Sequence, residues 1–295
     1  MNEIKLTNGV HIKFKIITKN HFKQLHKTFQ LSFRNYHTTI NTSLSAFESR
    51  IERIGVSLNL SVAAYHNDEM VGFIIQAEDI IQGIKTAYNG GTGILPAYRG
   101  NKLSKRLYEY NFEMLKKCGF EQCILEVISE NIPALKIYAQ LGFIPSRELV
   151  CYRTVNNFRQ SLPKIKINLQ KLENSIPDWH LYQQFFDFVP SWQNTTKSIL
   201  RNYENEIIIE ASYKAEIIGV IIFDPLQGKI SQLAVHSDFR RKGIGTQLLR
   251  AASALIRTNA VSIINVDKSS VGSNKFFLNS GFKEIITQQE MIRVL

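Results

Sequence analysis

The chain of 295 residues contains two successive copies of one sequence pattern. Each copy contains a helical stretch, two strands around a turn, a third strand, a basic loop, a long helix, another strand, a shorter helix and a Gly-Phe pair. Equivalent landmarks keep similar separations: 147 residues for Gly72 and Gly219, 141 for Arg99 and Arg240, and 139 for Gly142 and Gly281. Because solenoid repeats span only ~20–50 residues, this period predicts a duplicated domain.

The repeat predicts domains of residues 1–155 and 164–295, each near the usual domain size. A linker is expected at 156–163, where turn-forming residues such as Asn156, Asn157 and Pro163 lie between patterned segments. Hydrophobic periodicity predicts the elements of both copies. They are helical stretches at 20–54 and 179–202, strands at 61–65, 70–77, 207–213 and 217–223, and a last strand after each Gly-Phe.

Composition indicates a globular protein, with 44% hydrophobic and 11% aromatic residues. The longest apolar run, Ile217–Phe223, is far shorter than the ~20 residues of a membrane helix. The first residues show no basic segment followed by an apolar one, so no secretory signal is expected. We therefore expect a cytoplasmic protein with no membrane partner.

The three cysteines, Cys118, Cys123 and Cys151, are an odd number without a CxxC pair or a His/Cys spacing. A disulfide framework and a zinc site are therefore not expected. The pattern indicates reduced thiols in or near a core, and no metal.

The formal net charge of +11 divides almost evenly between residues 1–150 and 151–295. Nucleic-acid binding would place basic residues on one arm or face, so this distribution argues against it. A polyanionic small ligand bound once per half would fit the balance, and so would ordinary solubility.

The second half carries a strand that runs into a loop rich in arginine, lysine and glycine and then into a helix. Backbone N–H groups and the positive end of the helix would converge there, which favours a bound phosphate. Gly243 and Gly245 lack a Cβ, so a ligand can approach the main chain. The candidate cofactor-binding residues are Leu233, Ala234, Val235, Arg240, Arg241, Lys242, Gly243, Ile244, Gly245 and Thr246.

The first half carries a weaker version of this loop. Lys102 and Ser104 stand where the second loop has Gly243 and Gly245. Backbone donors survive such replacements, although an ordinary strand–helix turn with solvated lysines remains an alternative. The candidates here are Gly93, Ile94, Arg99, Gly100, Asn101, Lys102, Leu103 and Ser104.

The segment Arg240-x-x-Gly243-x-Gly245 resembles the acetyl-CoA loop of the GNAT superfamily of N-acetyltransferases. Its glycine spacing fits neither a Walker loop nor a dinucleotide fingerprint. The segment from Leu125 to Phe143 is similar to the second GNAT signature. The resemblance implies an α/β (α+β) fold in two tandem copies, each with a mixed, mostly antiparallel sheet flanked by helices. It also implies a V-shaped splay between two parallel strands, and acetyl-CoA as co-substrate.

The resemblance assigns Tyr138 as the catalytic acid that protonates the departing CoA thiolate, and Asn131 as a cofactor-site residue. A phenol of pKa ~10 suits a thiolate leaving group, although a packed aromatic is the alternative. In the second half Phe277 and Ser270 occupy these two places. The first half thus keeps the acid, and the second keeps the better phosphate loop.

The implied reaction is direct transfer of an acetyl group to a primary amine. A strand bulge at 90–93 or near Gln232 would aim N–H groups at the thioester carbonyl. Glu126 and His236 are candidate bases, although ordinary solvated or hydrogen-bonded roles are favoured for both. The alternative function is acetyl-CoA sensing without catalysis in one or both halves.

The acceptor is expected to be a small amine, an aminoglycoside-like molecule or a peptide amino group. The variable segments 29–54 and 185–196 would build its pocket. The protein is expected to be a monomer or a homodimer.

Overall fold

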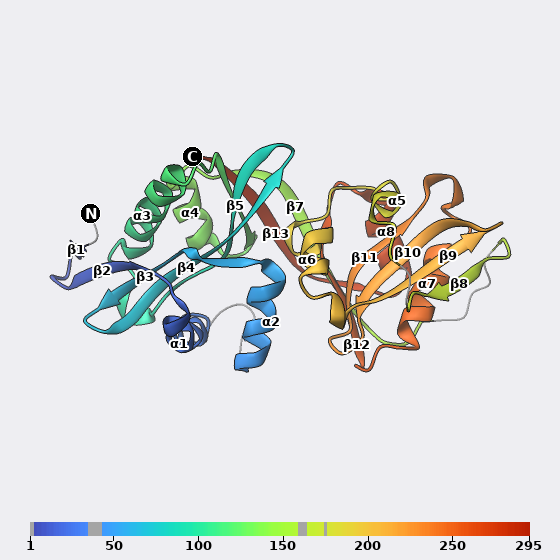
Figure 1. The fold of residues 1–295 in the computed structure, drawn as a ribbon, viewed down its shortest axis with the longest axis horizontal. Coiled ribbons are helices and arrows are strands. Elements are labelled where there is room, and N and C mark those ends of the chain that lie inside the picture. Colours follow the sequence, from blue (N-terminus) through green and yellow to red (C-terminus); the bar gives the residue numbers. More distant parts are fainter. Residues whose placement is uncertain (1–2, 35–42, 159–163, 174–175) are drawn as a thin grey trace. The chain divides into compact units, whose positions relative to one another are not determined.

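The computed structural model describes residues 3–34, 43–158, 164–173 and 176–295 (Figure 1). The chain divides into two compact units. Unit 1 consists of residues 1–146 together with 289–295, and unit 2 consists of residues 147–288. Each unit has a sheet covered by helices, as the repeated sequence pattern predicts.

The strands of unit 1 follow the order β1-β2-β3-β4-β5-β6-β13. Neighbours from β1 to β5 are antiparallel, whereas β5 and β6 are parallel. The bounds are β1 Glu3–Lys5, β2 His11–Ile16, β3 Val56–His66, β4 Glu69–Ile81, β5 Ile84–Ile94, β6 Gln122–Ile128 and β13 Lys283–Val294. The mixed, mostly antiparallel sheet confirms the predicted fold class.

Helices cover both faces of this sheet (Figure 1). On one face lie α3 (Leu103–Lys117) and α4 (Ile132–Gln140), and on the other α1 (Phe22–Ser32) and α2 (Leu44–Ile54). Separate apolar clusters fill the two interfaces. The central strands are therefore buried on both sides, which explains their long apolar runs. The helical stretch predicted at 20–54 is two helices, and residues 35–42 between them lie outside the described part.

The strands of unit 2 follow the order β7-β12-β11-β10-β9-β8. The parallel pair is β11 and β12, the counterpart of β5 and β6. The bounds are β7 Ile144–Val155, β8 Asn168–Lys171, β9 Ile207–Tyr213, β10 Glu216–Asp224, β11 Lys229–Val235 and β12 Ala260–Asp267.

The helices of unit 2 are α5 (Trp179–Gln183), α6 (Thr196–Leu200), α7 (Ile244–Ser253) and α8 (Val271–Asn279) among the described residues. The single helical stretch predicted at 179–202 is therefore wrong. Pro190 stands in its middle, and a proline cannot donate the hydrogen bond that a helix interior needs. The segment is instead two short helices, α5 and α6, joined by a connection that contains a 3-10 turn at Trp192–Asn194.

The last strand of each sequence copy contributes to the other unit. β7 continues past Ser146 to pair with β12 in unit 2, while β13 returns past Gln288 to lie beside β6 in unit 1. The backbone N–H of Leu295 donates to the carbonyl of Glu121 at 2.8 Å. The compact units thus differ from the predicted sequence repeats by an exchange of final strands. Of the predicted linker, residues 159–163 lie outside the described part.

Candidate functional site

The parallel strands of each unit separate after a short paired stretch. In unit 1 the pairing ends at Asn89 and Leu125, and in unit 2 at Ile230 and Ile263. The separation follows a bulge at the equivalent residue of β5 and β11. The register against the neighbouring strand shifts at Gly90 in unit 1 and at Ser231 in unit 2. Bulges bend a strand away from its partner, so both units have the predicted splay and bulge.

Unit 2 opens the splay further through β12. Ile264 and Asn265 stand opposite the single residue Cys151 of β7, and Asn265 has a left-handed backbone with φ of 60°. A cavity of about 340 Å³ lies between β11 and β12 at this point. Its walls also include the aromatic rings of Phe185, Phe186 and Phe276, so the cavity is apolar with a few polar groups.

The loop that is predicted to bind phosphate borders this cavity. Both units place two residues of the loop in the left-handed region: Gly100 and Lys102 with φ of 79° and 59°, and Arg241 and Gly243 with φ of 61° and 88°. The two loops therefore share one backbone path although glycine and a basic residue exchange places. Lys102 bears the left-handed strain that glycine avoids, on the order of 1 kcal/mol.

The leading arginine of each loop is held by main-chain carbonyls. Arg240 donates to the carbonyls of Val235 and Phe185 at 2.9 and 3.0 Å, and Arg99 donates to those of Ile94 and Ser32 at 3.1 and 2.6 Å. These contacts tie the loop to the preceding strand and to the segment on the opposite face. The arginines thus shape the loop, and the role of Arg99 and Arg240 in binding the cofactor stays a prediction.

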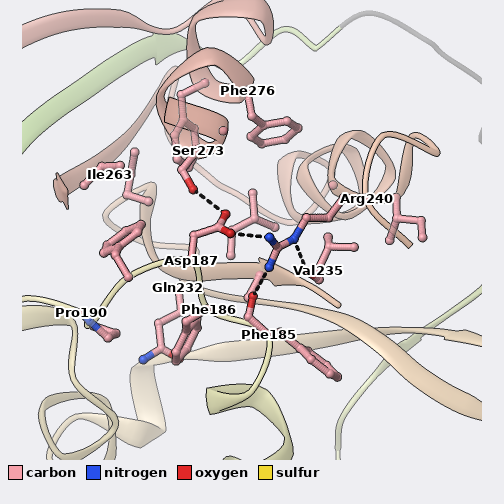
Figure 2. Close-up of a pocket in the computed structure, with 18 of the residues that line it drawn as sticks. Phe185, Phe186, Asp187, Pro190, Gln232, Val235, Arg240, Ile263, Ser273 and Phe276 are labelled. Atoms are coloured by element: carbon pink, nitrogen blue, oxygen red, sulfur yellow. Dashed lines mark hydrogen bonds and ion pairs between the residues drawn. The ribbon is translucent and has the colours of Figure 1, made fainter. Parts of the chain in front are cut away.

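Asp187 extends across the cavity of unit 2 (Figure 2). Its carboxylate pairs with Arg240 and accepts a hydrogen bond from Ser273 of α8 at 3.1 Å. The sequence analysis did not predict Asp187 as a site residue, and the residue at the matching position of the first repeat has the opposite charge. Ser32 and Phe185 occupy equivalent places beside the arginines, so Arg34 is the counterpart of Asp187 in unit 1.

The other loop residues of unit 2 divide between the cavity and local packing. Leu233, Ala234, Val235, Arg241, Gly243, Ile244, Gly245 and Thr246 line the cavity. Lys242 instead donates to the carbonyl of Asp238 at 2.9 Å and lies over the ring of Phe239. A Cβ on Gly245 would lie 3.1 Å from the ring of Phe276, so that glycine also serves helix packing.

In unit 1 several predicted loop residues have structural contacts. Leu103 is a core residue, and Gly93 lies against Phe73, where a Cβ would approach the ring to 2.5 Å. Asn101 accepts a hydrogen bond from Thr7 at 2.9 Å. These contacts leave the backbone amides of the loop as the groups suited to a phosphate.

Tyr138 packs half-buried against the core of unit 1 in a cluster of aromatic and polar groups. Its ring meets the ring of Tyr108 edge-to-face, with centroids 5.9 Å apart. The Tyr108 hydroxyl lies 2.8 Å from the Thr92 hydroxyl and accepts a hydrogen bond from Asn89. Burial, and next the negative charge that Tyr138 would carry, raise the pKa of Tyr108 well above its usual 10.

Unit 2 has only apolar side chains at the equivalent positions. The strand registers and helix starts align Asn89, Thr92, Tyr108 and Tyr138 with Ile230, Leu233, Leu249 and Phe277. Burying polar groups costs free energy unless they are hydrogen-bonded, so a buried polar cluster in only one of the two units indicates a role beyond packing. The sequence prediction noted only Tyr138 and Phe277. The polar residues on the buried face of the helix 103–117 could have indicated the other members of the polar cluster.

Three further predicted residues have local roles. Asn131 caps α4 by accepting a hydrogen bond from the N–H of Ala134 at 3.2 Å. Glu126 accepts a hydrogen bond from the hydroxyl of Tyr88 at 3.0 Å, and His236 accepts one from the N–H of Asp238 at 3.3 Å. The hydrogen-bonded roles favoured for Glu126 and His236 therefore agree with these contacts.

The cysteines are free thiols, with Cys118 exposed and the other two buried. Burial raises the pKa of Cys123 to about 12, so its thiol stays protonated. Within the described ranges, no three His, Cys, Asp or Glu side chains gather in a way that could hold a metal ion. No helix of those ranges has the length and apolar character to cross a membrane.

Comparison with known families gives two matches in succession. Residues 22–143 match the acetyltransferase (GNAT) family, and residues 169–293 match the acetyltransferase (GNAT) domain. The chain belongs to the GNAT acetyltransferase family. Two tandem GNAT domains thus account for the repeated pattern, and this family consists of acetyl-CoA-dependent N-acetyltransferases.

Curated relatives match over part of their length. N-alpha-acetyltransferase 30 of Schizosaccharomyces pombe is 28% identical over 93 residues, which are 31% of this chain and 62% of the relative. The protein of the same name in Dictyostelium discoideum is 27% identical over 96 residues, 32% of this chain and 52% of the relative. The chain therefore matches little more than half of these relatives.

Solved structures with the same fold cover nearly the whole chain. A GCN5-related N-acetyltransferase from Sphaerobacter thermophilus aligns with a TM-score of 0.75 at 14% identity, over 96% of this chain and 95% of the other. A tandem GNAT protein from the clavulanic acid biosynthesis pathway aligns with a TM-score of 0.73 at 12% identity, over 96% and 98% of the two chains. At these identities the likeness establishes the fold.

Proposed function

We propose that the protein transfers an acetyl group from acetyl-CoA to a primary amine by direct transfer. The observation that carries the proposal is the cavity of unit 2, which lies between the splayed strands and against the backbone of the phosphate loop. We assign residues 1–155 and 164–295 as the two sequence repeats. Each of them contains one of the two family matches.

An elongated polyphosphate ligand suits the surface of unit 2. A second cavity, of about 620 Å³, shares Arg241, Thr246 and Phe276 with the first. A pantetheine arm in the splay and a nucleotide in the second cavity would therefore be joined past the loop amides, where the pyrophosphate would accept hydrogen bonds. Arg241 makes no ion pair with any described residue and is exposed, so its charge is available to the phosphates.

We assign the chemistry to unit 1, where Tyr138 lies beside a buried polar cluster. The amine nitrogen attacks the thioester carbon, so that a C–N bond forms and the C–S bond breaks. The departing thiolate takes a proton from Tyr138, and the amine loses a proton to water. Backbone N–H groups near the bulge at Gly90 would stabilise the oxyanion.

Calorimetry with acetyl-CoA and an assay of CoA release over a panel of amines test this function. The panel contains a small polyamine, an aminoglycoside and peptides with a free amino terminus. We expect binding that weakens as salt rises, because charges hold the ligand, and CoA release with at least one amine. No binding heat at millimolar acetyl-CoA would refute the proposal.

A peptide amino terminus is one acceptor class that we propose to test first, because two relatives are N-alpha-acetyltransferases. In unit 2 the segment 185–190 lines the cavity, whereas residues 35–42 of the corresponding segment in unit 1 lie outside the described part. The monomeric or homodimeric state stays a prediction.

The second candidate function is acetyl-CoA sensing without catalysis. The observation that favours it is Phe277, since phenylalanine has no proton to give and unit 2 holds the described cavity. Stoichiometric binding of acetyl-CoA without CoA release from any amine would support sensing and exclude transfer.

A further inference from the structure

The structure assigns Tyr108 as a positioning residue for acetyl transfer in unit 1, where its hydroxyl orients the Tyr138 phenol and fixes the bulge of β5. This inference rests on the proposed function, because it concerns the same site. Tyr108 belongs to neither of the two sequence signatures that resemble the GNAT family. It lies in the middle of α3 and is fully buried.

Tyr108 contacts Tyr138, the proposed catalytic acid. The rings of Tyr108 and Tyr138 meet edge-to-face, and a hydrogen bond with Tyr138 is among the causes that raise the pKa of Tyr108, after burial and the charge of Tyr138. Tyr108 therefore stays protonated. A neutral hydroxyl beside a phenolate stabilises the phenolate, which makes Tyr138 a better acid.

Tyr108 also contacts the residues that flank the bulge of β5. The Tyr108 hydroxyl bonds both Thr92 and Asn89, and the side-chain Oδ1 of Asn89 accepts a hydrogen bond from the N–H of Gly91 at 2.9 Å. Asn89 and Gly91 flank Gly90, the residue that bulges from β5. One hydroxyl thus reaches both the acid and the strand segment where the oxyanion donors are expected.

Few other titratable groups face this cluster among the described residues. Cys123 of β6 is protonated, as its pKa of about 12 shows, and Arg293 of β13 lies over the ring of Phe112 at 4.2 Å. The aromatic neighbours Phe112 and Phe143 complete the surroundings of Tyr108. The Tyr108 hydroxyl is therefore a neutral polar group in a position to tune Tyr138.

The test compares Tyr108→Phe with Tyr110→Phe, a matched control that removes a hydroxyl from the same helix. The ring of Tyr110 packs on Phe14, and its hydroxyl makes no hydrogen bond with a described residue. We expect Tyr108→Phe to lower kcat about tenfold, as the loss of one well-placed hydrogen bond does. KM for acetyl-CoA should stay within about twofold, and Tyr110→Phe should match the parent.

A titration that does not depend on activity completes the test. With ¹³C-labelled tyrosine, the Tyr138 resonance is assigned by its loss in Tyr138→Phe. Its titration midpoint should lie higher in Tyr108→Phe than in Tyr110→Phe, because the phenolate has lost a stabilising donor. Equal midpoints in the two variants would overturn the inference.

The two proposals fail in different ways. Absence of acetyl transfer by the parent protein would refute the proposed function and leave the midpoint comparison intact. If Tyr108→Phe does not fold, Thr92→Val removes the neighbouring hydroxyl and keeps both rings. Because the Tyr108 hydroxyl then loses one competing partner, the Tyr138 midpoint should shift downward, and an unchanged midpoint counts against Tyr108.

Discussion

Asp187 and Ser273 are joined by a hydrogen bond of 3.1 Å that connects the segment 185–190 to α8. The carboxylate also pairs with Arg240, so a negative charge borders the cavity next to the phosphate loop (Figure 2). The counterpart in unit 1 is the cation Arg34. The two loops share a backbone path, but the residue at this sequence position has opposite charge in the two units.

The first prediction concerns this charge. Asp187→Asn removes the repulsion between the carboxylate and a bound polyphosphate, so acetyl-CoA should bind unit 2 about threefold more tightly, the effect of a partly exposed charge. The gain should shrink as salt rises. Titration calorimetry at two ionic strengths measures both effects.

Ser273→Ala is the matched control for that variant. It breaks the connection to α8 without changing charge, so affinity should stay within about twofold of the parent. Weaker binding by Asp187→Asn would instead mean that the carboxylate supports the site by holding Arg240 in place.

A second prediction concerns the phosphate loop. Gly243→Asp places a carboxylate beside the expected pyrophosphate at a residue with φ of 88°, so acetyl-CoA affinity should fall more than about tenfold. Gly83→Asp is the matched control, because Gly83 has a similar φ of 83° and open space around it. If Gly243→Asp binds acetyl-CoA as the control does, the loop does not hold phosphate.

The third prediction separates the two units by their chemistry. Tyr138→Phe removes the proposed acid and should lower turnover ~10²-fold or more, while calorimetry should find acetyl-CoA binding nearly unchanged. Phe277→Tyr should not restore activity, since Phe277 is buried among the rings of Tyr152, Phe276 and Phe282. Full activity of Tyr138→Phe would mean that the reaction takes place in unit 2 or that water protonates the thiolate.

The fourth prediction concerns the exchanged strand. Deletion of residues 289–295 removes Met291 from the core of unit 1 and uncovers the edge of β6. We expect unit 1 to lose about 3 kcal/mol of stability, as for a buried methionine, and to become sensitive to protease. Val294→Ala, at a side chain that is 79% exposed, is the control in thermal unfolding and should match the parent.

Local sequence signals predicted the parts of the site that depend on neighbouring residues. The loops after β5 and β11 were found because glycine, basic residues and a helix start follow one another directly. The bulges near Gly90 and Ser231 are likewise local features.

Contacts between distant segments left no such signal. Asp187 reaches Ser273 across more than 80 residues, and the polar cluster joins Tyr108 of α3 to Asn89 of β5. Periodicity also failed at 179–202, where apolar residues recur at helical spacing but Pro190 interrupts the hydrogen bonding. The exchange of β7 and β13 could not be predicted, because the sequence of a strand does not determine which other strand it pairs with.

The pairing of β13 with β6 has a consequence for how the protein is made. A ribosome releases the chain from its amino terminus, so β6 emerges long before the strand that lies beside it. Until Leu295 reaches Glu121, the nascent unit 1 presents an open strand edge to other chains. Its completion therefore awaits the synthesis of residues 289–295. A ribosome-stalled chain ending before residue 289 is a species in which aggregation or chaperone capture should be greatest.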